Sequence, residues 1–138
     1  MAPPSGPYNI GLPEDQLLTA QDGNNVIGSP VNILPPTGNP GEQDWHLQNE
    51  GDSITLMNLR APIFAGFEGE PEEGSRIVLV RGPCRFYTEA GDDRQHHYIY
   101  AERDGQRLYL NVSPVRIFPP QLALSSRREA PWKFQFLE

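Results

Sequence analysis

The octapeptide Ser29-Pro30-Val31-Asn32-Ile33-Leu34-Pro35-Pro36 recurs near the other end of the chain as Ser113-Pro114-Val115-Arg116-Ile117-Phe118-Pro119-Pro120, with six of eight positions identical. Each copy is followed, after a loop, by a Trp at the head of an alternating stretch, Trp45 in one case and Trp132 in the other. A weaker copy without the Trp lies at 77–83 and continues into 85–88. Such self-similarity indicates one structural unit used three times.

Repeats at 8–52, 53–95 and 96–138 each leave room for four short strands, after a flexible N-terminal segment at 1–7. Apolar and polar residues alternate at 54–57 and 132–136, and Gly-containing turns separate such runs. We expect strands at 8–11, 17–20, 31–34, 45–49, 53–58, 63–67, 76–80, 85–88, 97–101, 107–111, 115–118 and 132–137. The sequence therefore predicts one all-β domain, a β-trefoil of twelve short strands, with a β-sandwich as the alternative.

Composition narrows the class of protein. Gly and Pro supply 28 of 138 residues, which disfavours long helices, and a net charge of −7 disfavours a nucleic-acid partner. Residues 1–75 carry a charge of −10 and residues 76–138 a charge of +3. A single cysteine, Cys84, forms no internal disulfide, and the N-terminus has neither a signal sequence nor an apolar run that could span a membrane. We expect a cytoplasmic monomer that does not bind membranes.

No set of residues suggests an enzyme. His96 and His97 are adjacent, so on a strand they would point to opposite faces and could not share one metal ion. Cys84 lacks the pattern of a catalytic nucleophile, and the acidic run at 68–73 lacks the spacing of a calcium loop. We expect no catalytic residue, no cofactor and no metal.

Short motifs at both ends give a resemblance. Gly6-Pro7-Tyr8-Asn9-Ile10 and Pro13-Glu14-Asp15 open the chain, the Trp45 strand follows, and Pro131-Trp132-Lys133-Phe134 closes it. In these respects the chain resembles the small cytosolic β-trefoil protease inhibitors of mushrooms, with the cospin-like serine protease inhibitors as the closer match and the mycocypins similar in plan. The resemblance implies a basidiomycete source and an inhibitor that inserts an exposed loop into a protease.

A trypsin-like target needs Arg or Lys at P1, the residue on the N-terminal side of the bond presented to the enzyme, because its specificity pocket holds a carboxylate. The expected loop at 121–131 carries Arg127 and Arg128, and similar inhibitors use this loop against trypsin. We expect Arg127 to be P1, since Arg128 would place the acidic Glu129 next in line. Arg60, which precedes the small Ala61, is an alternative P1 residue.

Asparaginyl proteases require Asn at P1. In mycocypins the corresponding Asn lies in the connection matched here by Asn58, and Asn24 and Asn25 occupy a further loop that is reactive in some cospin-like members. That loop contains no Arg or Lys in this chain. The loops that mycocypins wedge over papain-like proteases correspond to 12–16 and 35–43, whose sequences show nothing decisive for that use.

A sugar-binding trefoil is the alternative from another class of protein. Gln43-Asp44-Trp45 satisfies the Q-x-W pattern of ricin-type lectins once, whereas the other two repeats do not. The predicted function is therefore inhibition of trypsin-like serine proteases, with cysteine or asparaginyl protease inhibition, or carbohydrate binding, as alternatives.

Overall fold

The fold consists of twelve short strands in three similar groups of four. A computed structural model describes residues 2–21 and 26–138, and within these ranges there is no helix that could cross a membrane. The strands are β1 (Gly6–Leu12), β2 (Gln16–Thr19), β3 (Asn32–Leu34), β4 (Trp45–Asn49), β5 (Ile54–Asn58), β6 (Phe64–Gly66), β7 (Val78–Val80), β8 (Tyr87–Ala90), β9 (His96–Arg103), β10 (Gln106–Val112), β11 (Leu122–Ser125) and β12 (Trp132–Phe136).

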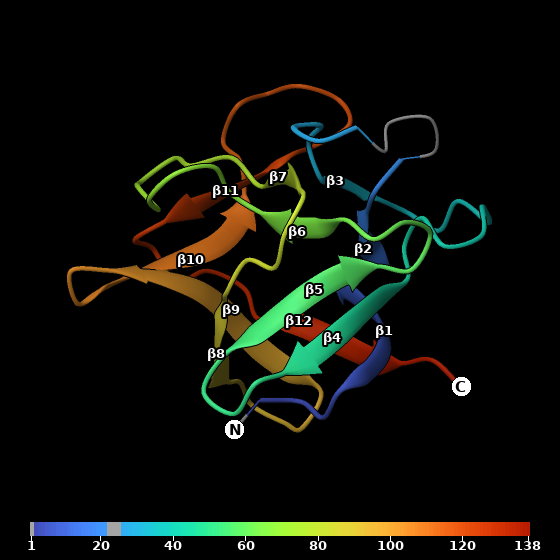
Figure 1. The fold of residues 1–138 in the computed structure, drawn as a ribbon, viewed down its shortest axis with the longest axis horizontal. Helices are drawn as coiled ribbons and strands as arrows, with labels where there is room; N and C mark the ends of the chain where they lie inside the picture. Colours follow the sequence, from blue (N-terminus) through green and yellow to red (C-terminus); the bar gives the residue numbers. More distant parts are fainter. Residues whose placement is uncertain (1, 22–25) are drawn as a thin grey trace.

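Six of these strands close a barrel, which occupies the lower half of Figure 1. The antiparallel order is β1, β4, β5, β8, β9 and β12, with β12 pairing back onto β1. The junction between β5 and β8 is a single bridge in which Ile54 and Phe86 exchange two backbone hydrogen bonds of 2.7 and 2.9 Å. Closure leaves the barrel without an unpaired edge strand.

Three hairpins, β2–β3, β6–β7 and β10–β11, cover one end of the barrel. They are linked around a threefold centre, because the Val31 amide donates to the Ile77 carbonyl and the Ile77 amide donates to the Leu122 carbonyl, both at 3.0 Å. The amide of Ile33 completes the ring by donating to the Pro120 carbonyl at 2.9 Å. A six-stranded barrel capped by three hairpins is the predicted β-trefoil.

In each repeat, one large aromatic residue at the equivalent position is buried in the core. Trp45 and Trp132 are fully buried, and each indole Nε1 donates at 3.0 Å to a backbone carbonyl, that of Leu18 or that of Leu110. The middle repeat lacks the Trp, and the fully buried Phe86 occupies the corresponding position there. These three aromatic residues lie among the buried aliphatic side chains that fill the barrel.

Eleven of the twelve predicted strands overlap an observed strand. The strand predicted at 115–118 is wrong. Residues 115–118 are not a strand: Val115 is 61% exposed and Phe118 is 87% exposed. The strand of the third repeat that corresponds to β3 is β11, at Leu122–Ser125, where Leu122 takes the place that Val31 has directly before β3. The second copy of the octapeptide is therefore an exposed connection between β10 and β11.

Residues 2–7 of the N-terminal segment make defined contacts, and the expected flexibility of 1–7 stays a prediction. Pro3 is buried, and its carbonyl accepts a 2.8 Å hydrogen bond from Nδ2 of Asn49. The hydroxyl of Ser5 accepts from the Asn49 amide at 2.9 Å, and β1 itself begins at Gly6. The segment is thus tied to the end of β4.

Candidate functional site

The connection between β11 and β12 holds the two expected P1 residues on a supported backbone. It is shorter than predicted, because Leu122, Ala123 and Leu124 are buried in β11. The Ser126 amide donates to Oε1 of Glu73 at 2.8 Å, and this hydrogen bond lowers the pKa of the Glu73 carboxyl. The Arg127 side chain is exposed, as an inhibitory residue requires.

The Arg127 carbonyl, however, faces the protein. It accepts a 2.9 Å hydrogen bond from Nδ2 of Asn111, a residue only 6% exposed, while the Arg127 amide donates to Oγ of Ser125 at 3.2 Å. A P1 carbonyl must enter the oxyanion hole of a serine protease. Arg127 would have to give up its bond to Asn111 to do so, and its P1 role remains a prediction.

Arg128 is engaged through its side chain. The guanidinium forms an ion pair with the Glu89 carboxylate and lies 4.6 Å from the centre of the Tyr98 ring. Burial alone would raise the pKa of Glu89, but hydrogen bonds from Tyr109 and Arg128, together with the charges of Arg128 and Arg107, lower it. Use of Arg128 as P1 would require this ion pair to break.

The connection between β5 and β6 does not present Asn58. This residue is 1% exposed, its Nδ2 donates to the Gly41 carbonyl at 3.1 Å, and its Oδ1 accepts from the Arg60 amide at 3.0 Å. Asn58 therefore shapes the loop from inside, and in this conformation it cannot enter the pocket of an asparaginyl protease. Arg60 is exposed, and its aliphatic stem lies so close to Gly41 that a Cβ added there would clash with the Arg60 Cγ.

Three further loops were considered from the sequence: the one with Asn24 and Asn25, and those at 12–16 and 35–43. Asn24 and Asn25 lie outside the described residues, so their expected role stays a prediction. The turn at 13–15 holds Glu14 and Asp15 at positive φ, 67° and 54°, beside a hollow of about 430 Å³ shared with residues 92–96 and 130–133. In the connection at 35–43, Oγ1 of Thr37 donates to Oε1 of Glu42 at 2.9 Å.

The Q-x-W residues are used for structure. Gln43 is 7% exposed, and its Nε2 donates to Oγ1 of Thr19 and to the Pro35 carbonyl, both at 3.0 Å. Trp45 is fully buried in the core. Neither side chain is available to a sugar, so this motif by itself provides no binding site.

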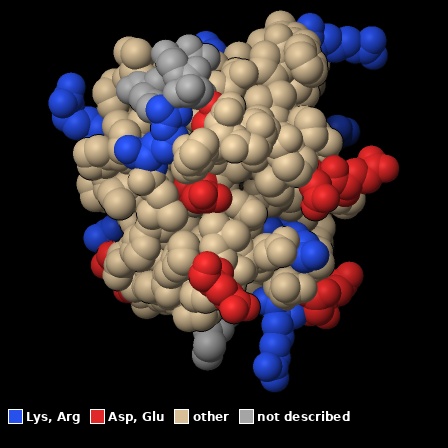
Figure 2. Space-filling model, turned by 90° about the vertical axis from the view of Figure 1, so that its right-hand side faces the viewer, with Lys and Arg blue, Asp and Glu red and all other residues tan. Residues whose placement is uncertain are grey.

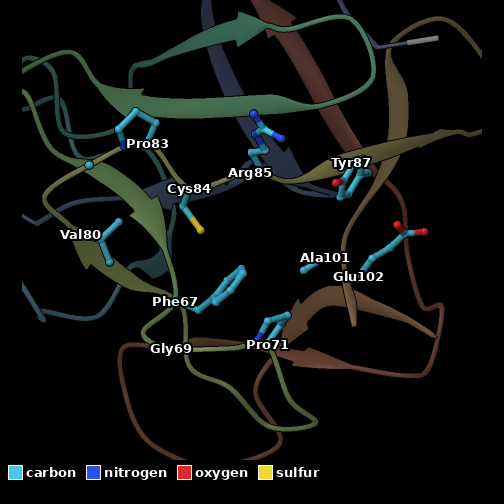
Figure 3. Close-up of a pocket in the computed structure, with 11 residues that line it drawn as sticks. Phe67, Gly69, Pro71, Val80, Pro83, Cys84, Arg85, Tyr87, Ala101 and Glu102 are labelled. Carbon is cyan, nitrogen blue, oxygen red and sulfur yellow. The ribbon is translucent and has the colours of Figure 1, made fainter. Parts of the chain in front are cut away.

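A separate hollow lies beside β8 and has a volume of about 500 Å³. Figure 3 shows the Phe67 ring and the Cys84 sulfur turned into it, with Tyr87 and Glu102 on the other side. The Tyr87 ring is stacked on Tyr100 at 5.6 Å, which fixes its position. Burial raises the pKa of the Cys84 thiol, which therefore stays protonated at neutral pH and is a poor nucleophile.

The two adjacent histidines do point to opposite sides of β9. His97 is buried, with Nε2 at 3.2 Å from the Arg94 carbonyl, whereas Nδ1 of the half-exposed His96 lies 2.8 Å from Oδ1 of Asp93. Among the described residues, no three His, Cys, Asp or Glu side chains come together as metal ligands.

Sequence reasoning missed the connection between β10 and β11, because its residues were assigned to a strand. Val115, Arg116, Ile117 and Phe118 are all exposed. The prolines at 114, 119 and 120 gave no signal, because the first copy of the octapeptide has prolines at the same positions and yet contains β3. This connection stands at the top of Figure 1, in orange to red.

The charged side chains do not form a single field on the face that Figure 2 shows. There Lys and Arg alternate with Asp and Glu among larger uncharged areas, over the described residues of that side. A nucleic-acid surface would show a continuous basic stripe. The expectation that the chain does not bind nucleic acid remains a prediction that agrees with this view.

Comparison with known proteins supports the fold. No family model matches the sequence, and no curated protein matches it. Among solved structures, the ricin B-like lectin of Macrolepiota procera in complex with lactose is similar over 99% of both chains, at 17% identity and a TM-score of 0.75. The Rhizoctonia solani agglutinin matches over 99% of both chains, at 18% identity and a TM-score of 0.77.

A third match comes from design. ThreeFoil, a designed protein with threefold symmetry, is similar over 96% of this chain and 99% of its own, at 15% identity and a TM-score of 0.81. At such identities the likeness establishes the β-trefoil scaffold, which hosts many functions, and leaves the activity to the residues of the loops.

Proposed function

We propose that this chain is a reversible protease inhibitor that inserts an exposed loop into the active site of trypsin-like serine proteases. The observation that carries the proposal is a pair of Arg-bearing connections, 113–121 and 126–131, fixed to a closed barrel. A hollow of about 340 Å³ lies between them, with Val112 and Pro114 on one side and Ser125 and Arg127 on the other.

A rigid frame is what a loop inhibitor needs. The free energy of binding is reduced by the entropy lost when a flexible loop becomes ordered, so a loop already held in place binds more tightly over the same area. The neck of the 113–121 connection and the backbone of the 126–131 connection both make hydrogen bonds to neighbouring strands or side chains. The mushroom inhibitors that the sequence resembles are cytosolic, and we extend the proposal to a monomer in the cytoplasm.

The test is a titration of trypsin, papain and asparaginyl endopeptidase with the purified protein, each followed with a fluorogenic substrate. We expect stoichiometric loss of trypsin activity at nanomolar protein, with papain unaffected. Bovine serum albumin at the same concentration controls for non-specific loss of enzyme. Activity of all three proteases at micromolar protein would contradict the proposal.

Carbohydrate binding is the second candidate, and the hollow beside β8 favours it. Sugars bind on aromatic rings next to polar groups, and this hollow offers Phe67 and Tyr87 together with the Glu102 carboxylate. The lactose complex of the Macrolepiota procera lectin supports the same candidate.

Calorimetric titration with lactose and a glycan array test this second candidate. If the hollow binds sugar, Tyr87→Ala should remove the heat of binding, whereas Val115→Ala, on an exposed loop elsewhere, should leave it unchanged. An array on which no glycan is retained would rule the candidate out.

A further inference from the structure

The connection between β10 and β11 is a loop with a closed neck. The Ser113 amide donates to the Gln121 carbonyl at 2.8 Å, and the Pro120 carbonyl accepts from the Ile33 amide of β3 at 2.9 Å. Asn32 and Gln121 form a β-bridge beside this contact. Residues 114–119 therefore project from a base that is fixed to the hairpin cap.

The side chains on this loop have the composition of a binding surface. Val115 is 61%, Ile117 46% and Phe118 87% exposed, although each would gain by burial. They surround the exposed Arg116. Apolar and aromatic side chains around an Arg are typical of the residues that carry the binding energy of protein interfaces. The loop is therefore suited to a protein partner that buries these side chains.

The backbone places Arg116 at the corner of a tight turn. The Ile117 amide donates to the Val115 carbonyl at 3.1 Å, which makes a three-residue turn with Arg116 at its centre. Arg116 is not among the residues with positive φ, so this is an inverse γ-turn, which an L-residue adopts without strain. The central side chain of such a turn points away from the contact that closes it.

Arg116 differs from Arg127 and Arg128 in that neither its guanidinium nor its carbonyl oxygen is bound to another described part of the chain. Within the described part of the chain, no hydrogen bond or ion pair involves the Arg116 guanidinium or its carbonyl oxygen. The Arg127 carbonyl is held by Asn111 and the Arg128 guanidinium by Glu89. Both the side chain and the carbonyl that a protease must receive are thus available at Arg116.

We propose that Arg116 is the P1 residue of the inhibitor and that the Arg116–Ile117 bond is the one presented to a trypsin-like protease. This inference rests on the proposed function and identifies its reactive loop. The Arg116 guanidinium enters the specificity pocket and pairs with its carboxylate, and the Arg116 carbonyl enters the oxyanion hole. Val115 and Phe118 pack on the enzyme surface on either side.

Charge decides between a protease and a second copy of this chain as the occupant. A twofold contact through the same loop would bring Arg116 against Arg116, and two like charges repel in a partly dehydrated interface. A protease pocket offers a carboxylate at the centre and apolar walls around it. The arrangement of one Arg among three apolar side chains complements the protease and not the loop itself.

The decisive experiment compares three variants of the full chain in the trypsin titration. Arg116→Glu should weaken inhibition by about a thousandfold or more, because it puts a carboxylate against the carboxylate of the pocket. Arg127→Glu and Arg60→Glu test the competing P1 candidates, and each should weaken inhibition far less than Arg116→Glu does. All three residues are exposed, so equal melting temperatures would show that each variant is folded.

Two further variants read out the P1 role directly. Arg116→Leu should lose trypsin and gain chymotrypsin as a target, because the P1 side chain selects the protease. Phe118→Ala should weaken trypsin binding about tenfold while the preference for trypsin is kept.

Each remaining outcome overturns the inference in a distinguishable way. Full inhibition by Arg116→Glu with loss in Arg127→Glu would leave the proposed function standing and move P1 to the neighbouring loop. Inhibition of papain or asparaginyl endopeptidase alone would keep an inhibitor and remove Arg116 from its site. If all three proteases keep their activity in the presence of the wild-type protein, the proposed function and the inference are both overturned. If the wild-type protein is a dimer and Phe118→Ser makes it a monomer, the loop serves self-association instead.

Discussion

At the scale of single residues, several side chains that look functional in the sequence prove to be parts of the frame. Asn58 and Gln43 use their amides to bind backbone groups of the turn at 39–42 and of the chain at 34–35. Polar side chains that are buried must find hydrogen-bond partners, and loops provide many unpaired backbone groups. A residue type that suits a protease or a sugar therefore also suits the inside of a loop, and only burial distinguishes the two uses.

His97 gives a prediction at this scale. Burial lowers the pKa of its imidazole, an effect that the hydrogen bond to the Arg94 carbonyl partly offsets, and Nδ1 has no partner among the described residues. The folded protein thus binds fewer protons at this site than the unfolded chain, whose His has a pKa near 6.5. The contribution of neutral His97 to stability is complete above that pH and is lost as the pH falls below it.

Urea unfolding at pH 7.5 and pH 5.5 tests this expectation. The free energy of unfolding should fall on acidification, by at most about 1.4 kcal/mol per pH unit from one site, and His97→Gln should reduce the fall. Ile117→Gln, at an exposed position that carries no titratable group, is the control that should keep it. The same pH dependence in wild type and His97→Gln would contradict the assignment.

At the scale of elements, two copies of nearly the same octapeptide differ in structure: the first is buried and contains a strand, and the second is an exposed loop. In the first, Val31 is fully buried against the β6–β7 hairpin and Ile33 is 3% exposed. In the second, Val115 and Ile117 face solvent, because β11 supplies Leu122 and Leu124 to the corresponding place in the cap. Both stretches of the third repeat are apolar enough for a strand, but it is residues 122–125 that pair with β10.

Matched substitutions in the two copies should therefore differ in effect. Val31→Asp buries a charge without a partner and should lower the free energy of unfolding by about 3 kcal/mol or more, whereas Val115→Asp should change it by less than about 0.5 kcal/mol. Urea denaturation followed by far-UV circular dichroism measures both. Similar losses in the two variants would mean that residues 115–118 are buried after all.

The sequence predicts those features of the fold that depend on local patterns. Alternation, turn residues and the repeat identify the fold class and eleven strands, because those signals are local and the trefoil uses them three times. The choice between 115–118 and 122–125 depends on which segment fills the cap, which is a contact between distant residues. For the same reason the sequence indicates Arg-bearing loops but does not reveal that Asn111 holds the Arg127 carbonyl or that Arg116 stands at a corner.

At the scale of the whole molecule, the three repeats depend on one another. Each hairpin of the cap makes backbone hydrogen bonds to another, as Val31 does to Ile77 and Ile77 to Leu122, and the barrel closes only when strands of all three repeats are present. A single repeat buries too few side chains to be stable. The loops that we propose to bind a protease thus stand on a frame whose rigidity belongs to the complete ring.

The two tryptophans allow this coupling to be tested. Trp45 and Trp132 report on the first and third repeats, and the middle repeat contains no Trp. Leu79→Ala removes a fully buried side chain from β7 of the middle repeat and should lower the free energy of unfolding by about 3 kcal/mol. Because the ring unfolds as one unit, the urea midpoints measured by Trp fluorescence and by far-UV circular dichroism should shift together. A fluorescence midpoint that stays at the wild-type value, while part of the dichroism signal is lost at lower urea, would show instead that the middle repeat unfolds alone, and the frame beneath the 113–121 loop would then depend on two repeats only.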